Sequence, residues 1–355
     1  MFPGQGSQSR GMGKELFARF PEETRIADDI LGYSIEDLCL RDPNRQLKET
    51  RFTQPALFVV NALKLKAFRE ENDAVADYVL GHSLGEFNAL YAAGSIDFET
   101  GVDLVRERGR LMAMAPPGGM AAVIDLGKAQ IEAILGDMGQ NDLQIANYNS
   151  PHQFVISGAQ EQIRLAEAPF TAAGGRYVVL NTGGAFHSPL MAPAQEEFAG
   201  FVRRKTFLPT SIPVISNVTA RPHGAGIADR IIRQITAPVL WTDSVEYLLS
   251  QAAPGDIGFE EIGHGQILTG LVTTIRKAFD QRPGAVAPPG NGKTPAEKAA
   301  QWNARHPVGT IVDCRPIGLT GLKTRTDAML IFPHRAGLYV ENYEGYFDID
   351  GLSAR

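Results

Sequence analysis

Gly81-His82-Ser83-Leu84-Gly85 stands between a short apolar run, Tyr78-Val79-Leu80, and a helical pattern over residues 86–93. This order of strand, Gly-x-Ser-x-Gly and helix predicts a nucleophile elbow, a sharp turn that strains the serine backbone and exposes its hydroxyl group. The hydroxyl would stand above a helix N-terminus, whose unpaired N–H groups and positive dipole end can stabilise an oxyanion. A glycine-rich turn with an unused serine is the alternative, and the flanking strand and helix argue against it.

The composition limits the class of protein. A chain of 355 residues is long enough for two domains, or for one large domain with an insertion. Its net charge of −6 argues against a nucleic-acid binder. The two cysteines, Cys39 and Cys314, lie far apart without metal-type spacing, so we expect a reducing, cytoplasmic setting. The sequence has no apolar run of membrane length and no signal-peptide pattern.

Residues 2–13 predict a tight loop, because they contain four glycines, one proline and a polar run. The loop lacks the Lys-Ser/Thr pair of a phosphate-binding P-loop. We therefore expect it to bring Gln5 close to a reacting centre. A buried strand would normally precede such a turn, so we expect the chain to be trimmed at its start.

The pattern of elements predicts an α/β fold. Strand-type runs alternate with helical patterns, which favours a mainly parallel sheet with helices on both faces. Between residues 120 and 180 the order is strand, helix, strand, strand, helix, strand, which is the ferredoxin-like pattern and indicates an inserted subdomain. The predicted parts are the first part of a large domain over 1–116, the small subdomain over 117–186, the second part of the large domain over 187–281, a Pro- and Gly-rich linker over 282–300, and a C-terminal extension over 301–355.

Some individual elements bear on the outcome. The patterns predict one helix over 14–27, a helix over 98–114 capped by Asp97, and a strand over 257–262. Thr53 is the expected N-cap of a further helix. We expect the extension to pack back on the main body, or on a domain that follows it in a longer chain, because it is too short for a confident independent domain.

Arg108 lies on the apolar face of the predicted helix over 98–114, in line with Val105 and Met112. An inward-pointing arginine requires an anion, because an unpaired buried charge is costly. The anion is either a substrate carboxylate or phosphate, or an internal Asp or Glu. Extension of the side chain to the surface is a further alternative. Helix geometry alone leaves all of these open.

A serine nucleophile needs a base, and His187 and His264 are the candidates. Both lie in glycine-rich loops after predicted strands, at the end of the sheet where the elbow serine is expected. His187 is favoured because it lies between an aromatic residue and a helix. His82 lies inside the elbow and cannot easily reach the neighbouring side chain. The remaining histidines are expected in surface loops or the tail: His152, His223, His306 and His334.

Together these motifs resemble the malonyl-CoA:acyl carrier protein transacylase family, which includes the acyltransferase domains of polyketide synthases. The resemblance is strongest to the discrete, trans-acting acyltransferases of polyketide assembly lines, and it covers residues 2–280. Each motif is modest alone, whereas the whole set in one order is highly specific. The set is Phe2-Pro3-Gly4-Gln5-Gly6-Ser7-Gln8, Thr53-Gln54-Pro55-Ala56, Gly81-His82-Ser83-Leu84-Gly85-Glu86, Arg108-Gly109, Phe186-His187-Ser188 and Trp241.

The resemblance implies roles for the catalytic residues. Ser83 would be the nucleophile and His187 the base. Gln5 and the backbone N–H of Leu84 would form the oxyanion hole. Gln234 would hold the histidine through its backbone carbonyl. The implied fold is an α/β-hydrolase-like large domain with a ferredoxin-like insert.

The resemblance also implies a substrate. Arg108 would bind the free carboxylate of the extender unit. Phe186 is similar to the residue at this position in malonyl-selecting members of the family. Relatives that select methylmalonyl units usually carry serine at this position. The implied reaction moves a malonyl group from coenzyme A to the phosphopantetheine thiol of an acyl carrier protein, in polyketide or fatty acid biosynthesis. The resemblance implies no metal or redox cofactor, and neither a nucleic acid nor a membrane as partner.

Other functions remain as alternatives. An acyl hydrolase of the same family, which clears stalled chains from carrier proteins, would share Ser83 and His187 but have little use for Arg108. An inactive interaction module would not need this set of side chains at all. The sequence therefore favours the transferase.

Overall fold

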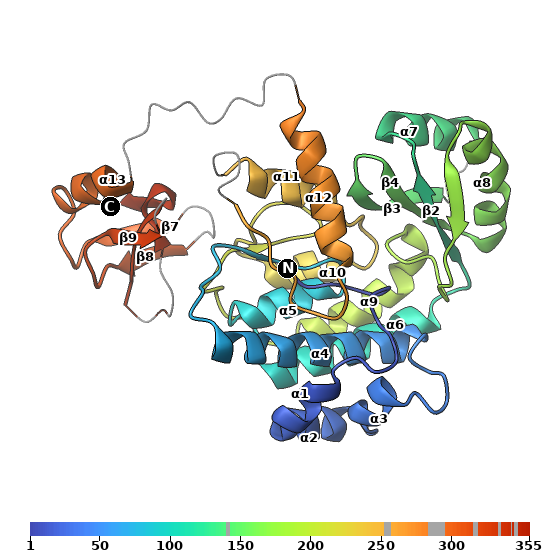
Figure 1. Cartoon of the computed structure of the whole chain (residues 1–355), viewed down its shortest axis with the longest axis horizontal. Coiled ribbons are helices and arrows are strands. Elements are labelled where there is room, and N and C mark those ends of the chain that lie inside the picture. The colour runs from blue at the N-terminus through green and yellow to red at the C-terminus, as the bar shows by residue number, and fades with distance from the viewer. Residues whose placement is uncertain are drawn as a thin grey trace.

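The computed structural model describes residues 1–139, 143–251, 257–282, 295–314, 319–332, 335–341, 343 and 347–355. Within them the chain is a mixed α/β protein (Figure 1). Its described strands form a parallel pair inside the main body, a four-stranded antiparallel sheet beside it, and two three-stranded sheets near the C-terminus. Among the described residues, no helix has both the length and the apolar character needed to cross a membrane.

The strand before the elbow pairs in parallel with a strand far along the chain. β1 (Val79–Leu80) lies beside β6 (Val214–Ile215), and Phe2 forms a parallel bridge with the first glycine of the elbow. The pairing direction agrees with the prediction, but these ladders are short. The strand predicted over 257–262 does not form. In that segment the backbone groups of Glu260 and Ile262 bond to Met1, and a single residue is too short a partner for a ladder.

Helices enclose this parallel pair. α4 (Thr50–Glu71) packs against α6 (Phe98–Met114), and α5 (Gly85–Ala92) leads out of the elbow. The other helices of the body are α1 (Lys14–Arg19), α2 (Pro21–Leu31), α3 (Ile35–Leu40), η1 (Pro189–Met191), α9 (Ala192–Val202), α10 (Ile227–Arg233), α11 (Trp241–Leu249) and α12 (Ile267–Asp280).

Local chemistry explains which helix predictions were right. The helix over 98–114 has the predicted bounds, and Asp97 caps it by accepting a hydrogen bond from a first-turn N–H. The predicted single helix over 14–27 is two helices, because Pro21 begins a new one. Thr53 is not an N-cap. Its hydroxyl donates to the carbonyl four residues earlier, inside a helix that has already begun.

The small sheet has the element order that the sequence predicts. β2 (Gly119–Ile124), α7 (Lys128–Asp137), β3 (Leu143–Ser150), β4 (Gln153–Gly158), α8 (Gln160–Ala172) and β5 (Arg176–Val179) follow one another along the chain. The strands lie in the order β3-β4-β2-β5 and pair antiparallel. A parallel bridge between Asn147 and Val239 joins this sheet to the body.

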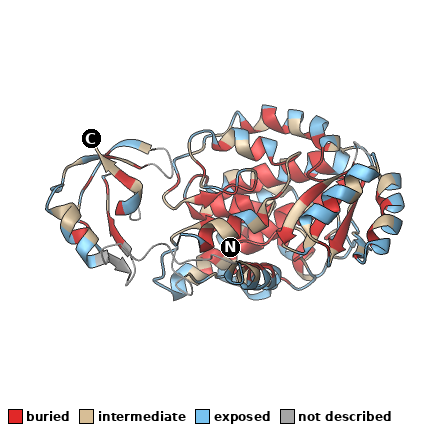
Figure 2. Ribbon diagram, turned by 90° about the horizontal axis from the view of Figure 1, so that it is seen from above, coloured by how far each residue is buried: buried red, intermediate tan, exposed pale blue. Residues whose placement is uncertain are grey.

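The buried apolar side chains fall into separate clusters. Figure 2 shows buried residues both in the main body and in the C-terminal part. The largest fills the body around Phe58 and Phe87. A second lies between the parallel strands, α11 and α12, around Trp241. The small sheet has its own cluster, which includes Ile156 and Phe170. Each part is therefore stabilised by its own burial of apolar surface.

The described C-terminal residues also form a cluster of their own, which includes Val312, Leu338 and Val340. Their apolar side chains pack on one another, so this part has a core of its own, for which we expected it to be too short; Figure 1 shows this part beside the body. Residues 283–294 of the predicted linker lie outside the described residues. The elements are α13 (Pro295–Asn303), β7 (Ile311–Cys314), β8 (Leu319–Lys323), β9 (Met329–Phe332), β10 (Arg335–Leu338), β11 (Phe347–Asp348), η2 (Ile349–Gly351) and β12 (Leu352–Ala354).

Because the clusters are separate, a chain that ends at Arg282 should keep a folded body. We expect its free energy of unfolding to differ from that of the full chain by no more than roughly 0.5 kcal/mol, as for changes away from a core. Arg282 is retained because it forms an ion pair with Glu246. Urea denaturation followed by circular dichroism measures the difference. A shortened chain that is unfolded in buffer would contradict the separation of the cores.

Candidate active site

The chain turns sharply at Ser83, which has a φ of 50°. This left-handed region is strained for a residue with a side chain. The glycines on both sides are required, because a Cβ on Gly81 would lie 1.9 Å from the Gly85 carbonyl carbon. Asn217 holds the turn: its Oδ1 accepts from the Ser83 N–H at 2.6 Å, and its Nδ2 donates to the Gly81 carbonyl at 2.7 Å. The strained elbow is thus stabilised both by its own glycines and by Asn217 from a loop far along the chain.

His187 reaches Ser83 from the loop between β5 and η1, with Nε2 2.8 Å from the Ser83 Oγ. Its Nδ1 lies 2.8 Å from the carbonyl oxygen of Gln234 and 3.1 Å from that of Ala237. Carbonyl oxygens only accept hydrogen bonds, so Nδ1 carries the ring proton and Nε2 is free to accept the proton of the serine. This is the geometry that a general base requires.

The surroundings of His187 keep its imidazole neutral. The residue is 3% exposed, and its burial is the main cause that lowers its pKa, to about 3. The positive charge of Arg108 is the next cause, and the two carbonyls oppose it in part. At neutral pH the ring is therefore unprotonated and able to take up a proton.

Arg108 points into the same site from the apolar face of α6 and is 1% exposed. Its Nη2 donates to the Ser83 Oγ at 3.2 Å and to the Gln234 Oε1 at 3.0 Å. Its Nη1 donates to the Gln54 Oε1 at 2.7 Å. Among the described residues these partners are all neutral oxygens, so neither an internal ion pair nor a surface position describes Arg108. Burial lowers the pKa of Arg108 to about 10, opposed by the charge of Glu86, and the guanidinium stays charged at neutral pH.

The loop that carries Gln5 contacts the backbone of the elbow through Gly4. Gly4 packs against it so closely that a Cβ there would lie 2.3 Å from the His82 carbonyl oxygen and 3.7 Å from the Leu84 nitrogen. The Oε1 of Gln5 accepts from the Thr50 hydroxyl at 2.9 Å, which ties the loop to α4. Leu84 precedes the first residue of α5, where backbone N–H groups lack helical partners.

The remaining sequence candidates lie in different places. Phe186 is buried in the cluster of the body, directly before His187. His264 is partly exposed and bonds to the Ser9 hydroxyl at 2.6 Å. Of these two histidines, the structure brings His187 to Ser83.

Sequence reasoning missed a polar group beneath the elbow. Glu86 accepts from the Nε2 of His223 at 2.7 Å, from the Nε2 of Gln234 at 2.6 Å and from the N–H of Asn217 at 3.1 Å. The expectation of a surface position for His223 is wrong, since its side chain and that of Glu86 are fully buried. One signal was present in the sequence: Glu86 is the only carboxyl residue of α5, and the other residues of this helix are uncharged.

The small sheet contributes side chains to the site as well. From β3, Gln144 donates to the His187 carbonyl, and the Oδ1 of Asn149 lies 2.8 Å from the Nε2 of His82. The ring of His82 also lies 5.5 Å from that of Trp241, and burial lowers the pKa of His82. The site therefore forms where the small sheet meets the body.

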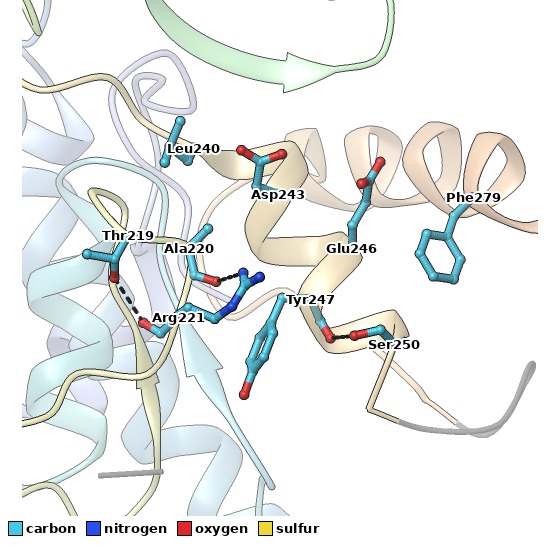
Figure 3. Close-up of a pocket in the computed structure, with 9 residues that line it drawn as sticks. All are labelled: Thr219, Ala220, Arg221, Leu240, Asp243, Glu246, Tyr247, Ser250 and Phe279. Atoms are coloured by element: carbon cyan, nitrogen blue, oxygen red, sulfur yellow. Dashed lines mark hydrogen bonds between the residues drawn. The ribbon is translucent and has the colours of Figure 1, made fainter. Parts of the chain in front are cut away.

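A separate hollow of about 540 Å³ lies between a loop, α11 and α12 (Figure 3). Arg221 lies 4.6 Å above the Tyr247 ring and donates to the Ala220 carbonyl, while Glu246 binds Arg282. This hollow shares no residue with the Ser83 cluster. Its lining residues are Thr219, Ala220, Arg221, Leu240, Asp243, Glu246, Tyr247, Ser250 and Phe279.

No group of three or more His, Cys, Asp or Glu residues in the described part of the chain is arranged to hold a metal ion.

Comparison with known proteins defines the class. Residues 1–307 match the family described as the acyl transferase domain. This match covers most of the chain, and the protein belongs to this family.

Particular relatives are close. The chain is 49% identical over 286 residues to the polyketide biosynthesis malonyl CoA-acyl carrier protein transacylase BaeC of Bacillus velezensis, covering 80% of this chain and 98% of that protein. A malonyl CoA-acyl carrier protein transacylase structure from Burkholderia pseudomallei is 50% identical with a TM-score of 0.77, covering 80% of this chain and 98% of that one. PlMCAT, solved as the malonyl-transacylase in complex with the type II PKS acyl-carrier protein AntF, is 35% identical with a TM-score of 0.72, covering 77% and 91%.

The burial of neutral His187 predicts a pH dependence of stability. In the unfolded chain the imidazole takes up a proton once the pH falls below its ordinary pKa of 6.5. In the folded chain its pKa is about 3, so it takes up the proton only near pH 3. As the pH falls from 6.5 towards 3, the unfolded state therefore gains protons first and the folded state loses stability, by up to about 1.4 kcal/mol per pH unit.

The control is His187→Gln, which cannot titrate. Urea denaturation of both proteins across this pH range gives the difference between their slopes, in which the effects of other groups cancel. Parallel curves would show that His187 has an ordinary pKa in the folded protein.

Proposed function

We propose that this protein transfers a malonyl group from coenzyme A, through an acyl-serine at Ser83, to the phosphopantetheine thiol of an acyl carrier protein. One observation carries the proposal: the hydroxyl of Ser83 contacts both a neutral imidazole and a buried guanidinium, which has no ion-pair partner among the described residues. The first supplies a base and the second a place for a carboxylate. The relatives described above are named malonyl CoA-acyl carrier protein transacylases, which supports the same donor and acceptor.

In the first half-reaction, the Nε2 of His187 takes the proton of Ser83 as the serine oxygen attacks the thioester carbonyl. The resulting oxyanion is stabilised by the backbone N–H of Leu84, the N-terminus of α5 and Gln5. The C–S bond then breaks, and the thiolate of coenzyme A leaves with the proton from His187. The acyl group remains as an ester on Ser83.

In the second half-reaction, the carrier's pantetheine thiol gives its proton to His187 and attacks the ester carbonyl. The same N–H groups stabilise the second oxyanion, and the serine oxygen recovers its proton when the ester bond breaks. The reaction is therefore of the ping-pong type. We propose no cofactor, because side chains and backbone groups of this chain supply every proton and every charge in the cycle. The solved complex of PlMCAT with AntF supports an acyl carrier protein as the partner.

The side chains around Ser83 suit a short, charged acyl group. A carboxylate that replaces the contact between Arg108 and Ser83 lies next to the ester, as the carboxylate of a malonyl group would. We propose that the Phe186 ring limits the space at the α-carbon. A hydrolase of acyl-carrier proteins would have no use for the buried charge of Arg108.

We also propose the organisation of the chain. The order β3-β4-β2-β5 with its two helices supports a ferredoxin-like subdomain over 117–186. The elbow between β1 and α5 supports an α/β-hydrolase-like large domain over 1–116 and 187–281, followed by a linker over 282–300 and an extension over 301–355. Cys39 and Cys314 belong to different cores, which supports a reducing, cytoplasmic location.

Incubation with malonyl-CoA should acylate the protein, and intact mass should detect the adduct. We expect no adduct in Ser83→Ala, which lacks the nucleophile. His187→Ala should acquire malonate at least about a hundredfold more slowly, the usual effect of losing a general base. His264→Ala is the matched control and should react at the normal rate. An unmodified wild-type protein would instead indicate an interaction module.

Arg108→Ala should change the choice of acyl group. Removing one partner of a buried charge pair costs roughly 3–5 kcal/mol, which is about two to three decades in rate or more at 1.4 kcal/mol per decade. We expect this loss for malonyl-CoA, while acetyl-CoA still acylates Ser83. Arg108→Lys keeps the charge but cannot make two parallel hydrogen bonds. Its malonyl-to-acetyl ratio should therefore lie between those of the wild type and Arg108→Ala. An unchanged malonyl-to-acetyl ratio in folded Arg108→Ala would rule out the carboxylate-binding role.

A further inference from the structure

Glu86 is a fully buried carboxylate directly behind the elbow. Its Oε1 accepts from the Nε2 of His223 at 2.7 Å. Its Oε2 accepts from the side chain of Gln234 at 2.6 Å and from the backbone of Asn217 at 3.1 Å. The proposed reaction cycle gives this carboxylate no role. Burying a charged group in the protein is nevertheless costly.

The contacts of Glu86 determine which way the Gln234 amide points. The Nε2 of Gln234 donates to Glu86 and, at 2.9 Å, to the backbone carbonyl of Ser83. A carboxylate and a carbonyl both accept hydrogen bonds, so the NH₂ group of Gln234 must face them. The Oε1 must then face the other way, where it accepts from the Nη2 of Arg108 at 3.0 Å.

This arrangement links Glu86 to Arg108 through a single amide. The guanidinium gains an acceptor and the nearby negative charge without a direct ion pair. A carboxylate in direct contact would occupy the guanidinium and compete with a substrate. With the amide between them, the Arg108 Nη2 is aimed at Ser83 and retains its attraction for a second anion.

We propose that Glu86, held by His223, is a positioning residue that acts through Gln234 to aim Arg108 and thereby sets the preference for acyl groups with a free carboxylate. This inference rests on the proposed function, in which Arg108 binds that carboxylate. It assigns selectivity to a side chain that touches neither the substrate nor the reacting atoms. His223 contributes by donating to the second carboxylate oxygen, which keeps Glu86 in place.

The test is Glu86→Gln, assayed by self-acylation with malonyl-CoA and with acetyl-CoA. The neutral amide lacks the negative charge of the carboxylate and has an NH₂ group in place of one oxygen, so it holds Gln234, and through it Arg108, more weakly. We expect the malonyl-to-acetyl ratio of rates to fall at least about tenfold, which corresponds to about 1.4 kcal/mol. In the Arg108→Ala background, Glu86→Gln should change the ratio no further, because the two residues act through one contact.

Glu261→Gln is the matched control. Glu261 is also a buried carboxylate, but it accepts from the N–H groups of Leu268 and Thr269 at 3.2 and 2.8 Å, at the start of α12. A merely structural role for Glu86 predicts that both variants lose stability and react with both thioesters in the normal ratio. That result, with folded protein, would overturn the proposal.

His223 provides a second test that does not depend on the folding of Glu86→Gln. His223→Gln can still donate to the carboxylate and should keep the normal ratio, whereas His223→Phe cannot and should lower it. Equal ratios in these two folded variants would also overturn the proposal. Arg108→Ala, measured alongside, distinguishes a failure of the proposed function from a failure of the positioning role. If Arg108→Ala leaves the malonyl-to-acetyl ratio unchanged, the proposed function fails. If Arg108→Ala lowers the ratio but the Glu86 and His223 variants do not, only the positioning role fails.

Discussion

A guanidinium and an imidazole share one hydroxyl group in this protein, and both are buried. Arg108 lies among neutral oxygens, so its charge is solvated by amides and a hydroxyl rather than cancelled. The same charge disfavours protonation of His187 and helps to keep its Nε2 available. A carboxylate that enters the site would meet the guanidinium on one side and the neutral ring on the other. The electrostatics thus prepare the site for an anion and for proton removal together.

This arrangement depends on segments that are far apart in the chain. Asn217 holds Gly81 and Ser83 of the elbow, and Gln234 contacts the serine, the histidine and the arginine through different atoms. The small sheet adds Gln144, which binds the backbone of His187. Because these polar groups pair with groups from other elements, the site can form only when the body and the small sheet are both folded. Buried networks of this kind are stabilising only when they are complete.

Residue patterns near one another in the chain were sufficient for part of this structure. The apolar spacing of α6 and its Asp97 cap predicted that helix to the residue, and with it the inward position of Arg108. The element order of the small sheet was predicted in the same way. Local sequence patterns could not predict contacts such as that between Glu86 and His223, which are 137 residues apart. Nothing in a short stretch of sequence shows which distant loop packs beneath the elbow. The core of the C-terminal part was missed for a similar reason, since its strands are short and its partners were sought in the body.

The position of Arg108 bears on why a buried charge can select a small acyl group. Its Nη2 lies 3.2 Å from the Ser83 Oγ, so under the proposed function an anion bound there must lie within a few bonds of the ester on Ser83. A malonyl group has one carbon between its carbonyl and its carboxylate, whereas a longer diacid would carry its charge past the guanidinium. An uncharged acyl group that takes the place of the contact between Arg108 and Ser83 would not replace that hydrogen bond, which is costly in a buried site. Under the proposed function, selectivity thus arises mainly from the cost of leaving a buried cation unpaired, and the shape of the pocket adds to it at the α-carbon.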